Sequence, residues 1–140
     1  MIPHHNVGVD LLQIGQLRSN DVRVRRMIFE MGDYHHQDLH TLETYAKDWE
    51  VAESKNFDGN ISNMELTRLR SAKGHEHDLM WLELMIRHHE GALVIARRVL
   101  ESGGNANLQT MARSVITVQA DEIVQMVRLR KDLCSLHSTC

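Results

Sequence analysis

The sequence contains few of the residues that interrupt helices or favour strands. Its 140 residues include a single proline, and aromatic residues make up only 4% of the chain. Runs of β-branched and aromatic residues, which are typical of strands, are scarce. Because proline ends helices and such runs favour sheets, we expect an all-α protein. At this length we expect a single domain, residues 1–140, with a core of its own.

Charge of one sign and long apolar runs are also missing. The formal net charge is −3, from 16 basic and 19 acidic residues that are mixed along the chain. Nucleic-acid-binding proteins usually carry a basic patch, so we expect no nucleic-acid partner. No apolar run approaches the roughly 20 residues of a transmembrane helix, so we expect no transmembrane segment. Glycine-rich phosphate loops and nucleophile motifs are lacking as well, which favours a protein that is not an enzyme.

Only two cysteines are present, and both lie in the tail, at Cys134 and Cys140. Two cysteines do not define a disulfide framework. They could form a short disulfide in an oxidising compartment, provide a soft metal-binding clip together with His137, or stay unpaired. The sequence leaves these three alternatives open.

Histidine and methionine are abundant instead, with ten and eight residues, and a motif that contains both occurs twice. Met-Ile-Pro-His-His at residues 1–5 returns as Met-Ile-Arg-His-His at residues 85–89. The same offset of 84 aligns further pairs: Met27 with Met111, Asp38 with Glu122, and Lys47 with Lys131. We therefore predict two copies of one unit, residues 1–49 and 85–133, joined by the connector 50–84. A duplicated unit that repeats its polar residues indicates a site near an internal two-fold axis.

Helical periodicity and turn residues predict four long helices, over about 3–18, 21–50, 76–101 and 106–134. Asn20-Asp21 separates the first two, and Gly103-Gly104-Asn105 separates the last two. A capping box that begins at Ser62 predicts a short helix near 63–72 within the connector. Because the turns are short, each pair should be an antiparallel hairpin. We expect a four-helix bundle made of two duplicated hairpins with a long connecting segment.

The two copies differ in what precedes them. The amphipathic segment 78–84 leads into the second copy, whereas the first copy has no such segment in this sequence. We therefore expect the apolar surface that faces Trp81 and Leu82 to lack its symmetry-related counterpart. Residues missing from this chain or a homodimer contact would then cover it. No signal peptide is present in the chain.

Polar residues interrupt the apolar faces of the predicted helices at one level. His35 and Asp38 interrupt the second helix, and Gln119 and Glu122 interrupt the fourth. Residues equally distant from a hairpin turn lie side by side, which pairs His35 with the first His-His motif and Gln119 with the second. Buried carboxylates need partners, so we expect the two hairpins to enclose one polar core.

Imidazoles and carboxylates in this core could bind a metal ion. The predicted ligands are His4, His5, His35, Asp38, Met85, His88, His89 and Glu122. Imidazole suits copper, zinc and iron, and thioether favours Cu(I), so copper is the first choice and zinc or iron are less favoured. One alternative is a structural or interaction module in which the polar network only specifies the packing. A second is an oxidoreductase with a metal in the bundle core, although the Glu-x-x-His pairs of di-iron bundles do not occur in this sequence.

Two blocks of the second copy resemble the bacterial family known as domain of unknown function 305: Asp78-x6-Met85-Ile86-x-His88-His89-x-Gly91-Ala92 and Gln119-x2-Glu122-Ile123-x2-Met126. The resemblance covers about residues 64–131 and recurs weakly over 1–49, where His35 and Asp38 replace the Gln and the Glu. It implies a ferritin-like four-helix bundle that is exported in bacteria, so we expect a periplasmic or secreted protein. It also implies a link to copper, which some members of this family bind, whereas most have no assigned activity.

Overall fold

The computed structural model describes the backbone of residues 2–49, 59–137 and 140, and the side chains of residues 6–35, 59–137 and 140. Every regular element within these ranges is a helix: α1 (Ile2–Arg18), α2 (Val22–Trp49), α3 (Asn63–Ser71), α4 (Gly74–Ser102) and α5 (Ala106–His137). The predicted all-α class is confirmed. No helix in the described ranges has the length and hydropathy needed to cross a membrane.

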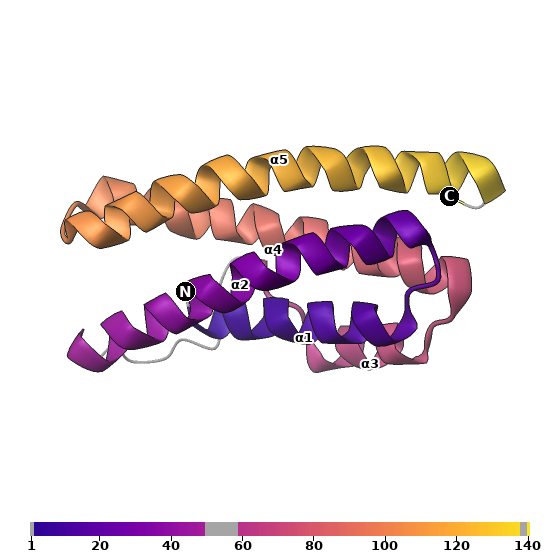
Figure 1. Ribbon diagram of the computed structural model, residues 1–140, viewed down its shortest axis with the longest axis horizontal. Helices are drawn as coiled ribbons and strands as arrows, with labels where there is room; N and C mark the ends of the chain where they lie inside the picture. Colours follow the sequence, from indigo (N-terminus) through magenta and orange to yellow (C-terminus); the bar gives the residue numbers. More distant parts are fainter. Residues whose placement is uncertain (1, 50–58, 138–139) are drawn as a thin grey trace.

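The helices form two antiparallel pairs, α1 with α2 and α4 with α5 (Figure 1). The pairs meet through α1 and α4, and the short helix α3 lies against both of these. The first turn joins Arg18 to Val22 and the second joins Ser102 to Ala106, so both hairpin turns are related by the offset of 84 residues. A ferritin-like bundle that arose by duplication stays a prediction.

Equivalent side chains cap the second helix of each pair. Asp21 Oδ1 accepts a hydrogen bond from the backbone N–H of Arg23 at 2.8 Å, and Asn105 Oδ1 accepts one from Asn107 at 2.8 Å. The Arg23 guanidinium also donates to the Asp21 carboxylate at 2.9 Å, and this hydrogen bond is the main reason why the pKa of Asp21 lies below its ordinary value. Both caps satisfy N–H groups that a helix leaves without partners in its first turn.

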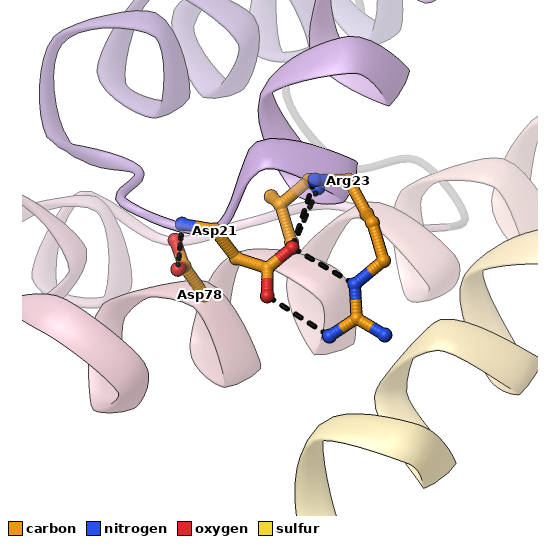
Figure 2. Close-up of polar contacts among 4 residues, drawn as sticks. Asp21, Arg23 and Asp78 are labelled. Atoms are coloured by element: carbon orange, nitrogen blue, oxygen red, sulfur yellow. Dashed lines mark hydrogen bonds and ion pairs between the residues drawn. The ribbon is translucent and has the colours of Figure 1, made fainter.

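A buried carboxylate on α4 holds the turn between α1 and α2 in place (Figure 2). Asp78 Oδ2 accepts a hydrogen bond from the backbone N–H of Asp21 at 2.9 Å, and Asp78 Oδ1 lies 3.3 Å from Nδ1 of the buried His77. Burial raises the pKa of Asp78, but the hydrogen bonds from His77 and Asp21 outweigh it and leave that pKa below its ordinary value. Asp78 therefore fixes the first hairpin to the beginning of α4.

The connector is attached to α4 by a charged contact as well. α3 begins with the predicted capping box, in which Ser62 and Glu65 exchange hydrogen bonds. Arg87 of α4 donates to Glu65 at 2.6 Å. Burial raises the pKa of Glu65, but the hydrogen bonds from Arg87 and Ser62 prevail and lower it to about 2. This contact lies one residue before His88 and ties the connector to that part of α4.

Two apolar clusters fill the interior. The larger joins α1, α2, α3, α4 and the second half of α5, and its fully buried side chains include Leu11, Ile28, Trp81, Met85 and Met126. The smaller lies between α4 and α5 near their connecting turn and consists of Ala92, Ala96, Ala112 and Val115. The small side chains of this second cluster allow α4 and α5 to approach closely.

Trp81 and Leu82 are both fully buried. The Trp81 Nε1–H donates to the Leu11 carbonyl of α1 at 2.8 Å, and a Cβ added at Gly15 would lie only 2.7 Å from the same nitrogen. These two residues are thus covered by α1, whereas the surface beside Met1, where the uncovered counterpart is expected, lies outside the described side chains, so that expectation stays a prediction. A homodimer stays a prediction.

Gly59 brings the end of the connector into direct contact with the backbone of α4. Its φ is +76°, and an added Cβ would lie 2.8 Å from the Arg87 carbonyl oxygen and 2.9 Å from both Gly91 Cα and the His88 carbonyl oxygen. Backbone atoms of a helix cannot move aside without breaking its hydrogen bonds. Glycine is therefore required here both for its φ and for the close approach.

We expect Gly59→Ala to lower the free energy of unfolding by more than a change at a comparable glycine. Gly74→Ala is the matched control, because Gly74 has a φ of +56° but its added Cβ meets nothing closer than Asn20 Nδ2 at 3.9 Å. The free energy of unfolding of the control should fall by about 1–2 kcal/mol, because alanine is strained in the left-handed backbone conformation. Gly59→Ala should lose a further 1–3 kcal/mol, roughly the cost of overpacking. Urea denaturation of both variants measures the difference, and equal losses would contradict the close packing at Gly59.

Candidate metal site

A layer of buried polar side chains separates the two apolar clusters. On α4, His88 and His89 lie between Met85 of the larger cluster and Ala92 of the smaller one. On α5, Gln119 lies between Met126 and Val115, and on α2, His35 lies one turn after Met31. His35, His88, His89 and Gln119 are all 0–1% exposed. We call these four residues, together with Glu122, the polar layer.

Three imidazoles of the polar layer lie against one another, although they come from different hairpins. The ring centroids of His35 and His89 are 5.4 Å apart, those of His88 and His89 are 6.1 Å apart, and those of His35 and His88 are 6.2 Å apart. Two imidazoles on one tetrahedral metal ion, with metal–nitrogen bonds of about 2.0–2.1 Å, would have centroids about 5 Å apart. The observed triangle is therefore slightly wider than one that shares an ion.

The polar layer is only partly satisfied by hydrogen bonds. His89 Nε2 lies 2.7 Å from the Glu122 carboxylate, and His35 Nδ1 lies 3.2 Å from the Met31 carbonyl oxygen. His89 Nδ1 and Gln119 Oε1 are buried and have no hydrogen-bond partner among the described residues. A buried polar atom without a partner costs about 1–3 kcal/mol, and such atoms in native structures call for an explanation, such as a bound water or ion.

A glycine on α1 closes the layer from the first hairpin. A Cβ added at Gly8 would lie 2.7 Å from His88 Nε2, 3.0 Å from His35 Cδ2 and 3.4 Å from His35 Nε2. Two imidazole nitrogens from different hairpins therefore lie close to one point beside the α1 backbone. Any side chain at position 8 would fill the space in front of both of them.

Four of the eight predicted ligands come together in this layer: His35, His88, His89 and Glu122. Met85 is fully buried, in the larger apolar cluster. The side chains of the other three, His4, His5 and Asp38, lie outside the described residues. Among the described side chains, no three His, Cys, Asp or Glu residues are arranged to hold a metal ion.

The structure adds one contact and one residue to the predicted site. Glu122 was predicted as a ligand, and its carboxylate contacts His89; its role as a ligand stays a prediction. Gly8 was not predicted at all. The offset of 84 aligns it with Ala92, so a small residue at the same place in both copies was the signal that could have identified it.

The structure also has a surface groove that the sequence did not indicate. It lies between α2 and α5, has a volume of about 300 Å³, and is lined by Arg23, Arg26, Met27, Glu30, Gln125, Arg128, Leu129 and Asp132. Its charges are of both signs, and none of its lining residues belongs to the polar layer. The groove is therefore separate from the candidate metal site.

The chain matches the model of a protein family described as domain of unknown function (DUF305) over residues 1–130. No curated protein sequence matches it. A solved DUF305 protein from Streptomyces coelicolor, provisionally described as secreted, has a TM-score of 0.85 at 21% identity and covers 93% of this chain and 86% of its own. A DUF305 fragment from Deinococcus radiodurans has a TM-score of 0.83 at 22% identity and covers 94% and 91%.

A third similar structure is CopM in its Cu(I)-bound form, with a TM-score of 0.81 at 18% identity over 94% of this chain and 91% of that one. CopM has also been solved in Cu(II)-bound, apo and Ag-bound forms. At these identities the likeness shows a shared fold.

Proposed function

The chain belongs to the DUF305 family, and on this basis we propose that it is a non-enzymatic, extracytoplasmic protein that binds copper in the polar layer between its two hairpins. The observation that carries the proposal is the triangle of three buried imidazoles, whose ring centroids lie 5.4–6.2 Å apart. Buried imidazoles from two hairpins are costly to desolvate together, and a shared cation would offset that cost.

The proposed roles follow from the contacts in the polar layer. His35, His88 and His89 are the central ligands. His89 donates its Nε2–H to Glu122, which leaves Nδ1 for the ion and fixes the orientation of the ring. Small rotations of the three rings would bring their nitrogens together.

The remaining predicted ligands would complete the site from its edges. Helical spacing places positions 4 and 5 on the face of α1 that carries Gly8, one turn away, so His4 and His5 are proposed as further imidazole ligands. Asp38 lies one turn after His35 on α2 and is proposed as the carboxylate of the first hairpin. Met85 lies one turn before His88 and His89 and is proposed as a thioether ligand.

Copper is favoured over zinc and iron because the site would combine imidazole with thioether, which is the donor set of copper sites. The copper- and silver-bound forms of CopM, a protein of the same fold, support this choice. An extracytoplasmic location is supported by the Cys134–Cys140 disulfide, since disulfides persist in oxidising compartments. The description of the Streptomyces relative as secreted points the same way.

A structural role for the polar layer is the second candidate. It is favoured by the short contact between His89 and Glu122. It is also favoured because no three His, Cys, Asp or Glu side chains among those described are arranged to hold a metal ion. A buried hydrogen-bonded network would then specify one packing of the two hairpins without binding an ion. The two candidates make different predictions about Gly8. If the polar layer binds copper, filling the space beside Gly8 should lower copper affinity, and if the layer is only structural, it should not.

We expect Gly8→Ala to lower copper affinity, measured by calorimetry on protein purified without an affinity tag. The added methyl group would stand against His88 Nε2 and His35 and prevent the rings from turning toward a common ion. The loss should be about 10-fold or more, the range seen when groups that orient metal ligands are changed.

Gly32→Ala is the matched control, because Gly32 is also a buried helical glycine but its added Cβ meets nothing closer than Gln16 Nε2 at 4.0 Å. This variant should gain about 0.5–1 kcal/mol of stability from helix propensity and keep the copper affinity of the wild type. Unchanged affinity in both variants would place any copper site elsewhere.

A further inference from the structure

A second group of potential metal ligands lies where α4 begins and α5 ends, at one end of the molecule (Figure 1). His75 is the second residue of α4, and His137 is the last residue of α5. Their rings are in contact, with centroids 3.9 Å apart. His75 is half-buried and His137 is exposed, so this pair of imidazoles is open to solvent, unlike those of the polar layer.

Two cysteines lie close to His137 in the sequence. Cys134 and Cys140 form a disulfide, and His137 lies midway between them in the sequence. Residues three apart on a helix share one face, which places Cys134 beside His137 on α5, and the disulfide holds Cys140 against Cys134. The tail therefore has the spacing Cys-x2-His-x2-Cys, and the ring of His75 on α4 contacts its histidine, His137.

We propose that these four residues form a redox-controlled site for a soft d10 ion, Zn(II) or Cu(I). While the disulfide is intact, the two sulfur atoms are bonded to each other and neither can act as a thiolate ligand. A dithiol reductant would convert the disulfide to two thiols and become a disulfide itself. Binding of the ion then displaces the two thiol protons and gives a site of two thiolates and two imidazoles. This donor set is typical of tetrahedral zinc, and thiolates also select Cu(I).

The site is independent of the proposed copper site. His75 and His88 are separated by 13 residues of α4, or about 20 Å at the rise of an α-helix. None of the four residues belongs to the polar layer. Cys140 is exposed and Cys134 is half-buried, so a reductant and an ion can both reach them. The disulfide closes a short segment with a sequence separation of only 6, and its reduction should leave the helical core folded.

Titration of the full chain with Co(II), in its oxidised and reduced forms, tests the proposal. Co(II) reports thiolate ligands through charge-transfer absorption and tetrahedral geometry through intense visible bands. We expect both signals in the reduced protein, none in the oxidised protein, and loss of both signals on addition of one equivalent of Zn(II). Circular dichroism should show the same helix content in both forms. If the reduced protein shows no charge-transfer absorption, the proposal is wrong.

Three variants distinguish the metal ligands from residues that do not bind the ion. Cys134→Ser/Cys140→Ser should abolish the charge-transfer absorption under all conditions. His75→Ala should retain the thiolate signal but weaken Co(II) binding and shift the visible bands, because α4 contributes one imidazole. The same spectra for His75→Ala and the wild type would show that α4 takes no part and would overturn the proposed four-residue site. His88→Ala/His89→Ala should leave the reduced-state signal unchanged, which separates this site from the polar layer.

Discussion

His88→Ala/His89→Ala should abolish copper binding in calorimetry and remove any copper-dependent rise in Tm. The change removes two of the three imidazoles that lie within 6.2 Å of one another in the polar layer. A ligand that binds only the native state stabilises it by mass action, by about 2.7 kcal/mol at 100 times its Kd. The wild type should therefore melt at a higher temperature with copper than without it, and the double variant should melt at one temperature in both.

A histidine of the same helix provides the control. His77 is as deeply buried as His88 and His89 but contacts Asp78 rather than the polar layer. His77→Ala should lower stability without copper and leave the copper-dependent rise in Tm intact. If the double variant loses stability but keeps the copper affinity of the wild type, the polar layer is a structural network and the proposed function is wrong.

Trp81→Ala should produce the largest loss of stability among single changes in the core. The indole is fully buried between α1 and α4, and its Nε1–H donates to the Leu11 carbonyl at 2.8 Å. Truncation of a buried Trp or Phe to alanine costs about 3–5 kcal/mol, a large fraction of the total for a domain of this size. Urea denaturation followed by circular dichroism measures the shift in midpoint.

Two further variants separate the contributions of buried apolar area and of the hydrogen bond to the stability provided by Trp81. Trp81→Phe keeps an aromatic ring but loses the hydrogen bond to Leu11. It should therefore lower the free energy of unfolding by less than Trp81→Ala does. Phe29→Ala removes an aromatic ring that is 71% exposed on α2, and such surface changes are usually within about 0.5 kcal/mol of neutral. A loss at Trp81→Ala as small as that at Phe29→Ala would show that α1 does not pack on α4 as described.

The helices and their turns could be predicted because local residues determine them. Asp21 and Asn105 cap α2 and α5 through hydrogen bonds to N–H groups two and three residues away, and such contacts do not depend on the rest of the fold. The turns after Arg18 and Ser102 likewise lie where the sequence placed them. The level of the buried imidazoles followed from the same information, since equal distance from a short turn brings residues of a hairpin together.

By itself the sequence thus determined the all-α class, the helix ends and the presence of histidines at one level of the hairpins. Tertiary structure alone decided that Glu122 contacts His89, that Gly8 faces His35 and His88, and that His75 meets the disulfide-bonded tail. These contacts join residues that are 27 to 80 positions apart, and they depend on how α1, α2, α4 and α5 are placed against one another. Capping and periodicity act within one or two turns of a helix, whereas the placement of helices is the outcome of packing the whole core.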